Sequence, residues 1–116
     1  MPSAPSTTAL LRTLDATTKY NYNMSINFEW DEKKRQANIR KHGIDFVDIP
    51  ALFDGVIITI EDTRHDYGET RLITLGLLKY HVIVVVHTDR NGNTRIISAR
   101  KATKNESKIY FQKITN

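Results

Sequence analysis

The chain contains no cysteine and only four histidines among its 116 residues. The absence of cysteine excludes disulfide bonds, thiolate metal sites and a cysteine nucleophile. The histidines, His42, His65, His81 and His87, stand far apart and include no pair at helical ligand spacing, so we expect no metal site and no cofactor. The longest purely apolar run, Val82 to Val86, is far shorter than the roughly 20 residues that span a bilayer. We therefore expect a cytoplasmic protein that has no membrane partner.

Negative charge is scarce in the C-terminal quarter of the chain. Overall, 17 lysines and arginines against 13 aspartates and glutamates give a net charge of +4 and a pI near 9.4. From Gly92 onward, six cations stand against the single anion Glu106, so this segment carries a net charge of +5. The six cations are Arg95, Arg100, Lys101, Lys104, Lys108 and Lys113. Such a block favours an anionic partner, and phosphate and an acidic protein fit it equally well.

Residues 1–23 lack the apolar periodicity of a packed element. They are rich in Ser, Thr, Ala and Asn, hold Pro2 and Pro5, and show one short apolar patch that comprises Ala9 to Leu11 and Leu14. We expect a disordered leader that can be deleted without loss of stability, and a short, poorly packed helix is the alternative. Because patterning begins abruptly at Met24, this residue is a candidate for the natural start. We expect a single domain over residues 24–116.

The first part of that domain has the pattern of one strand followed by two helices. Apolar and polar residues alternate from Ile26 to Trp30, which predicts a half-buried strand. Asp31 is placed to cap a helix with Glu32 in its first turn and basic residues in its last turns, ending before Gly43. Asp45 is placed to cap a second helix, which Pro50 either kinks or begins.

Runs of β-branched residues then predict four strands, over residues 56–61, 71–78, 81–88 and 94–101. Asn91-Gly92 is the strongest short signal for a hairpin. A two-residue turn there pairs His87 with Ile96 and places His87, Ser98 and Arg100 on one sheet face, unless the pairing slips by one residue. The apolar run in the third of these strands predicts a central strand covered on both sides.

A capping box from Thr103 to Glu106 predicts a short C-terminal helix that docks through Ile109 and Tyr110. The predicted order of elements is therefore β-α-α-β-β-β-β-α. This order indicates an α+β fold in which two N-terminal helices pack on a largely antiparallel sheet.

The polar loop, residues 63–71, separates two apolar strands. It concentrates two guanidinium groups, an imidazole, two carboxylates and a phenol, which belong to Arg64, Arg71, His65, Asp66, Glu69 and Tyr67. A loop that only turns the chain needs Gly, Asn, Asp or Pro and not Arg and His. We therefore expect the loop to carry function. In the alternative, Gly68 makes the turn and the charges are merely solvated.

Three blocks of the sequence together resemble the BrnT family, which comprises toxins of type II toxin–antitoxin systems with a RelE-like fold. The blocks are Phe28–Glu32 continuing to Lys41–Phe46, then Arg64 with Tyr67–Arg71, and finally Arg95–Thr103 with Glu106 and Tyr110. The resemblance implies an endoribonuclease that cuts RNA and halts translation. It also implies a BrnA-type antitoxin that holds the toxin inactive and alone contacts the operator DNA.

RNA cleavage without a metal needs a base for the 2′-hydroxyl, cations for the charged phosphate and an acid for the leaving 5′-oxygen. His65 is the best acid or base by its ordinary pKa, and Glu69 either orients it or serves as the base. Guanidinium groups match phosphate oxygens, so the clamp candidates are Arg64, Arg71, Arg95 and Arg100. In the alternative, Arg95 and Arg100 pair with Glu69, Asp62 or Glu106. We interpret His81 and His87 as strand residues and not as catalysts.

The remaining basic residues are candidates for binding. We expect Lys101 and Lys104 to bind RNA, while Tyr67 either stacks on a base or fills a gap in the core. The antitoxin is expected to bury Arg35 and Arg40 on the basic face of the first predicted helix, although solvation or RNA binding explains this face equally well. Two other function classes stay open, a non-catalytic module that binds RNA or protein and a ParE-like gyrase inhibitor.

Overall fold

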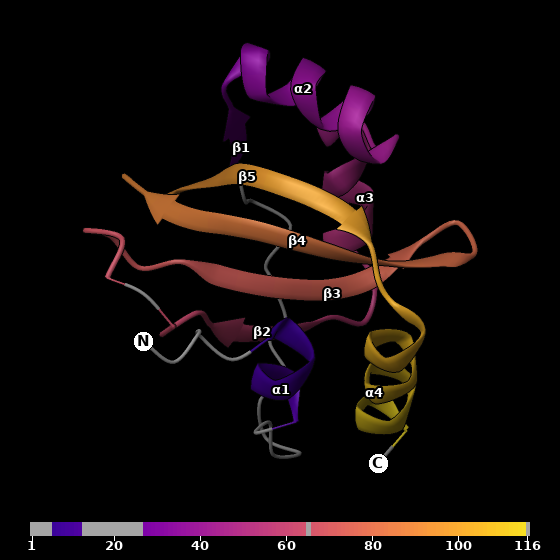
Figure 1. Cartoon of the computed structure of the whole chain (residues 1–116). Coiled ribbons are helices and arrows are strands. Elements are labelled where there is room, and N and C mark those ends of the chain that lie inside the picture. Colours follow the sequence, from indigo (N-terminus) through magenta and orange to yellow (C-terminus); the bar gives the residue numbers. More distant parts are fainter. Residues whose placement is uncertain (1–5, 13–26, 65, 116) are drawn as a thin grey trace.

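The computed structural model describes residues 6–12, 27–64 and 66–115 (Figure 1). Its sheet contains the strands β1 Asn27–Trp30, β2 Ile58–Glu61, β3 Leu72–Leu78, β4 His81–Arg90 and β5 Asn93–Lys101. The helices of the described part are α1 Thr7–Leu11, α2 Glu32–His42, the 3₁₀ helix η1 Phe46–Asp48, α3 Ile49–Phe53 and α4 Lys104–Ile114. The predicted α+β class is confirmed. None of these helices is long and apolar enough to cross a membrane.

The five strands lie in the order β1-β5-β4-β3-β2. β2, β3, β4 and β5 pair antiparallel in succession, whereas β1 joins β5 in parallel, so the sheet is largely antiparallel. β4 lies in the middle, and Val82 to Val85 are buried on both sides of it. The uninterrupted apolar run therefore marks a central strand, as the sequence predicts.

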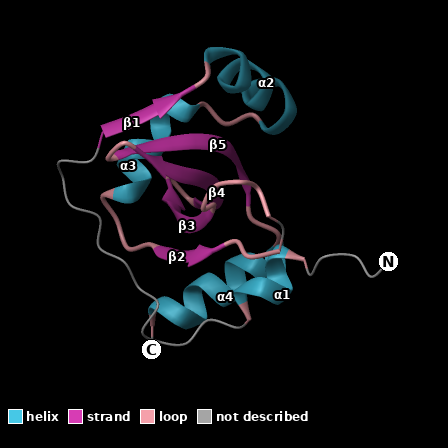
Figure 2. Cartoon of the chain, turned by 90° about the vertical axis from the view of Figure 1, so that its left-hand side faces the viewer, coloured by secondary structure: helices cyan, strands magenta, loops and turns pink. Residues whose placement is uncertain are grey.

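Different helices cover the two faces of the sheet. On one side, which we call the α3 face, Ile83, Val85 and Ile96 pack in a core that includes η1 and α3. On the other side, the α4 face, Val82 and Val84 pack in a core that includes α1 and α4. Figure 2 shows α1 and α4 side by side next to β2, while α2 lies at the opposite edge of the sheet, near β1 and β5.

Asn38 is the single buried residue of α2, and its hydrogen bonds fix this helix to the sheet. The Asn38 amide nitrogen donates to the carbonyl oxygens of Ile44 and Ala99, at 2.9 and 2.8 Å, and its oxygen accepts from the Ala99 N–H. Both predicted caps are confirmed: Asp31 accepts from the first N–H groups of the helix, and Gly43 ends the helix with a φ of 73°. α2 therefore stays solvated on most of its surface and still has a fixed position.

Pro50 begins a helix and does not kink one. Asp45 caps η1 by accepting a hydrogen bond from the Val47 N–H at 3.1 Å, and α3 follows with Pro50 in its first turn. α3 then packs closely on β3, where a Cβ atom added to Gly76 would lie 2.7 Å from Leu52 Cδ2. Because Gly76 has no side chain, α3 can approach β3 this closely.

The β4–β5 hairpin follows the predicted register only in part. Asn91 and Gly92 form the two-residue turn, both with positive φ, and His87 pairs with Ile96 as predicted. Beyond that pair β5 bulges at Ile97, so that Ser98 pairs with Val86. The prediction that His87 shares a face with Ser98 and Arg100 is therefore wrong. His87 lies on the α3 face, and the extra residue moves Ser98 and Arg100 to the α4 face.

The structure places a helix in the segment that the sequence predicts to be a disordered leader. Ser6 caps α1 by accepting a hydrogen bond from the Ala9 N–H at 3.1 Å. Leu11 is fully buried in the α4-face core, in the same cluster as Ile109 and Tyr110. The leader prediction is thus wrong for residues 6–12, because an apolar patch too short to show periodicity forms a helix that packs against α4. The other leader residues lie outside the described part, and the domain boundary at residue 24 stays a proposal.

Candidate functional site

The polar loop lies at the end of the sheet where β2 ends and β3 begins, beside the β4–β5 hairpin (Figure 1). Backbone pairing continues into the loop, because the Asp62 N–H donates to the Arg71 carbonyl oxygen at 2.8 Å. On the other side, the Thr88 hydroxyl donates to the Thr70 carbonyl oxygen at 2.6 Å. These bonds fix both ends of the loop against the sheet. His65, the predicted acid or base, lies outside the described residues.

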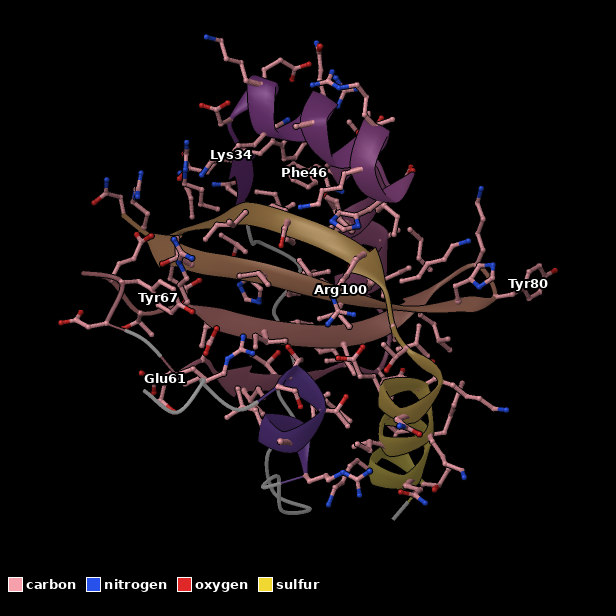
Figure 3. All side chains as sticks on the ribbon, in the orientation of Figure 1. Lys34, Phe46, Glu61, Tyr67, Tyr80 and Arg100 are labelled. Carbon is pink, nitrogen blue, oxygen red and sulfur yellow. The ribbon has the colours of Figure 1, made fainter. Side chains whose placement is uncertain are left out.

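Three of the four candidate arginines lie on the α4 face. Arg95 pairs with Thr88, and Arg100 pairs with Val84, which belongs to the α4-face core. Continuing the β3–β4 register by one residue places Arg71 opposite Thr88, so Arg71, Thr88 and Arg95 form one row across the strands. Figure 3 shows this side of the sheet, with Tyr67 beside its loop end and Arg100 on β5. The structure thus brings together residues from the loop and from the C-terminal basic block.

The fourth candidate, Arg64, is engaged with a carboxylate. Its Nε and Nη2 each donate to one Asp62 oxygen at 2.8 Å, and its Nη1 donates to the Thr7 hydroxyl of α1 at 3.2 Å. Arg64 lowers the pKa of Asp62 to about 2, against the opposing effect of burial. Arg64 therefore anchors the loop to the body of the protein.

Tyr67 forms a platform for Arg71. The Tyr67 hydroxyl donates to Asp62 Oδ2 at 3.2 Å, which fixes the ring, and the Arg71 guanidinium carbon lies 4.0 Å from the ring centre. Burial and the Asp62 carboxylate raise the pKa of the Tyr67 hydroxyl. Because Arg71 lies over one ring face, Tyr67 supports a cation, a role that neither predicted alternative named.

Arg71 differs from the other candidate arginines in its contacts. Its Nε is buried and has no hydrogen-bond partner among the described residues. The closest ion-pair contact that it makes there, with Glu69 Oε1, has a separation of 3.9 Å. A buried donor without a partner calls for an explanation, and a catalytic role or a bound water or ion is one. Arg71 is thus the candidate arginine that the described residues engage least.

Arg90 is a member of the site that the sequence reasoning missed. Its Nη2 donates to Glu69 Oε2 at 3.1 Å, so the Glu69 carboxylate lies between Arg71 and Arg90. A signal for Arg90 was present in the sequence. The predicted turn near Lys79-Tyr80 pairs Leu78 with His81, and counting back along both strands puts Glu69 opposite Arg90.

Arg95 and Arg100 form salt bridges, as the alternative interpretation held. Arg100 binds both Glu106 oxygens, at 2.8 and 2.9 Å, whereas Arg95 pairs with Glu29 of β1, at 3.1 Å, and not with a predicted partner. Burial tends to raise the pKa of Glu106, but hydrogen bonds from Arg100 and the Thr103 backbone outweigh it and lower that pKa. The Arg100–Glu106 pair therefore joins β5 to the start of α4.

The other predicted binding residues are dispersed. Arg35 of α2 donates to both Asp45 oxygens, at 2.7 and 2.9 Å, and to Glu32, so its charge is used within the chain. Arg40 is exposed. Lys101 pairs with Ile83 and so belongs to the α3 face, and Lys104 is exposed in the first turn of α4. These cations do not join the arginines of the α4 face.

His87 is a core residue, as the sequence interpretation held. It is fully buried, its Nε2 lies 2.7 Å from the Thr74 hydroxyl, and its ring packs edge-on against Phe53. Burial lowers the pKa of His87 to about 4, so the ring is neutral near pH 7. This histidine stabilises the α3 face and takes no part in the site.

The comparisons with known proteins show the family to which this chain belongs. A family model described as the ribonuclease toxin BrnT of type II toxin–antitoxin systems matches residues 30–106. The matched span includes the polar loop and the Arg100–Glu106 pair, whereas Glu29 and α1 lie before it. A search of curated proteins finds no match. Among the described residues, no group of three or more His, Asp or Glu side chains is arranged to hold a metal ion.

Proposed function

We propose that this chain, which belongs to the BrnT family of ribonuclease toxins of type II toxin–antitoxin systems, cuts RNA on its α4 face without a metal ion. The observation that carries the proposal is the state of Arg71, a guanidinium held on an aromatic ring with a buried N–H that lacks a partner among the described residues. Among the described residues, the guanidinium contacts a carboxylate only at the long distance of 3.9 Å, to Glu69, so a phosphate oxygen has little to displace when it binds. We further propose that the fold is RelE-like and that cleavage inhibits translation in the cytoplasm.

The proposed reaction is a transfer within the RNA strand. A base removes the proton of a 2′-hydroxyl, and the 2′-oxygen attacks the adjacent phosphorus. The bond from phosphorus to the 5′-oxygen then breaks, and an acid gives that oxygen a proton. The products are a 2′,3′-cyclic phosphate and a free 5′-hydroxyl, so atoms and charge balance without a co-reactant.

The residues divide these tasks. Arg71 and Arg95 stabilise the charge that develops on the phosphate, since they lie in one row and one Arg71 donor has no partner among the described residues. The Glu69 carboxylate lies between Arg71 and Arg90, next to the arginine row, and serves as the base or orients His65. Arg64 and Arg100 act mainly through their carboxylate partners, as positioning residues for the loop and for β5.

Membership of a type II toxin family implies an antitoxin partner. We propose a BrnA-type antitoxin that covers the α4 face and carries the only contact with operator DNA. Exposed cations such as Arg40 would pair with acidic residues of this partner. Affinity for the antitoxin that does not change between low and high salt would contradict this electrostatic docking.

The assignment of His65 is tested by comparing two histidine variants. If His65 transfers a proton, His65→Ala should slow RNA cleavage by about 10²–10⁴-fold while the melting curve stays unchanged. His81→Ala is the matched control, because His81 is exposed and lies at the opposite end of the sheet. A folded His65→Ala that cuts at the wild-type rate would shift proton transfer to Glu69.

A second candidate function, a module that binds RNA or protein without cutting, has its own support. Carboxylates already engage Arg64, Arg95 and Arg100, which leaves fewer guanidinium groups to stabilise the phosphate in the transition state of cleavage. RNA that is retained by the purified protein and stays intact would favour this candidate.

A further inference from the structure

A pocket of about 250 Å³ lies between α2 and β5, outside the arginine row. Its lining residues are Lys34, Ala37, Asn38, Lys41 and His42 of α2 and Ile97 and Ser98 of β5. Figure 3 shows α2, with Lys34 labelled, above β5 on the side of the sheet where Arg100 is labelled. The pocket therefore borders the surface on which we place the RNA.

The pocket has a fixed shape because its two walls are joined. Asn38 makes three hydrogen bonds, two of them with the backbone of Ala99 in β5, and all are buried. The bulge at Ile97 adds a residue to β5 at this level and turns Ser98 toward the α4 face. A binding site with rigid walls loses little entropy when a ligand enters.

The charge of the pocket has one sign. Its ionisable lining residues are Lys34, Lys41 and His42, and no aspartate or glutamate lines it. Within the described part of the chain, neither lysine forms an ion pair. By contrast, the neighbouring Arg35 is bound by Asp45 and Glu32. The lysine charges thus remain available to an anion.

The pocket also offers apolar surface, from Ala37 and Ile97, between the two lysines. A nucleotide has this combination, since its phosphates are anionic and its base and sugar present flat or aliphatic surface. The volume is slightly below the roughly 300–1,000 Å³ of small-molecule pockets, which suits about one nucleotide and not a folded protein element. An acidic peptide would satisfy the lysines but would leave the apolar surface uncovered.

We propose that this pocket binds one nucleotide of the RNA strand next to the cleavage site, with its flanking phosphates on Lys34 and Lys41. The inference rests on the proposed function, because it needs an RNA strand on the α4 face. Ser98 lines the pocket and precedes Arg100 by two residues on the same face, so a strand that leaves the arginine row reaches the pocket directly. The pocket then fixes the register of the RNA over the site.

Binding of 2′-O-methyl RNA tests the proposal, because this probe keeps its phosphates but lacks the attacking hydroxyl. We expect the double variant Lys34→Ala/Lys41→Ala to bind a short labelled strand at least about tenfold more weakly. The slope of log affinity against log salt should fall by roughly 1.4, the value for two lost phosphate contacts on a single strand. The matched control is Lys33→Ala/Lys108→Ala, which removes the same charge from exposed positions outside the pocket.

Each outcome decides the matter. A loss of RNA affinity confined to the pocket variant supports the assignment. Wild-type affinity in the pocket variant, or an equal loss of affinity in the control variant, overturns it. Loss of polyglutamate binding in the pocket variant with unchanged RNA binding would overturn it in favour of an acidic partner. If the wild-type protein binds the probe through these lysines but never cuts 2′-hydroxyl RNA, the proposed function fails and the pocket assignment stands.

Discussion

The two faces of the sheet are built from the same strands but treat polar groups in opposite ways. On the α3 face, Thr59, Thr74 and His87 form a chain of hydrogen bonds, with separations of 2.7 Å, and no member is more than 2% exposed. On the α4 face, the side chains of Arg71, Arg95 and Arg100 are 28%, 26% and 33% exposed. The first arrangement is closed to ligands and stabilises the fold, whereas the second presents cations at the surface.

The arginines of the α4 face also differ among themselves. Arg100 is bound at both ends of its guanidinium fork by the buried carboxylate of Glu106. Arg71 rests on the ring of Tyr67 and keeps a donor without a partner in the described part of the chain. Removing Arg100 should therefore affect mainly stability, and removing Arg71 should affect mainly activity.

The largest expected effect is on catalysis. Arg71→Ala should slow RNA cleavage by about 10²–10³-fold, as does the loss of one preorganised donor to a developing oxyanion. Arg71→Lys should not fully restore the rate, because an ammonium group cannot replace the planar fork. Single-turnover kinetics on folded protein give the rates, and Arg12→Ala, a change of an exposed arginine after α1, is the control. Equal rates for Arg71→Ala and the control would remove the distinction between the arginines.

A slightly smaller effect is expected on stability when the other arginine is removed. Arg100→Ala leaves the Glu106 carboxylate buried without its cation and should lower the free energy of unfolding by about 2–4 kcal/mol. Chemical denaturation measures this loss. The double variant Arg100→Ala/Glu106→Gln should recover part of it, since the uncompensated charge is gone. A loss for Arg100→Ala below about 0.5 kcal/mol would mean that the pair contributes little.

Leu11 of α1, which packs on the α4 face, should contribute about 2–3 kcal/mol to the free energy of unfolding. Leu11→Ala removes a fully buried side chain from the core between α1 and α4 and should lower the melting temperature. Ala9→Ser, a change at an exposed position of the same helix, is the control. If both variants melt like the wild type, α1 is dispensable and the prediction of an unstructured leader returns.

The smallest expected effect concerns pH and the α3 face. Burial lowers the pKa of His87 to about 4, so between pH 6.5 and 4 the unfolded chain binds a proton that the folded chain excludes. Stability should thus fall by about 2 kcal/mol as the pH drops from 7 to 4.5. The contribution of Asp62, whose pKa is lowered to about 2, is lost only at lower pH.

His87→Gln tests this assignment, because glutamine keeps a hydrogen-bonding group beside Thr74 but does not titrate. Urea unfolding at both pH values should show a weaker pH dependence for His87→Gln and an unchanged one for His81→Gln, which alters an exposed histidine. An unchanged dependence in His87→Gln would place the titrating group elsewhere.

Local signals predicted most of the fold. The caps Asp31 and Gly43, the Asn91-Gly92 turn and the capping box at Thr103 all lie where the sequence places them. Each depends on residues within a few positions of one another, so a short stretch of sequence contains the whole physical cause. The central position of β4 followed in the same way from one unbroken apolar run.

Features that depend on residues far apart in the sequence were not predicted. The bulge at Ile97 carries no glycine to mark it, and it decides on which face Ser98 and Arg100 lie. The partner of Arg95 is 66 positions away on β1, and Thr7, which binds Arg64, is 57 positions from it. The residue types of the candidate site were therefore readable from the sequence. Which arginine has a donor without a partner in the described part of the chain depends on the tertiary structure.

Cleavage of RNA in the presence of a chelator tests the central claim, that the α4 face cuts RNA without a metal. The purified wild-type protein should cut a labelled strand at the same rate with and without chelator, and analysis of the ends should find 2′,3′-cyclic phosphate and 5′-hydroxyl groups. Arg71→Ala, measured in the same reaction series, should cut about 10²–10³-fold more slowly. Cleavage that stops in chelator, or products that carry a 5′-phosphate, would contradict the account.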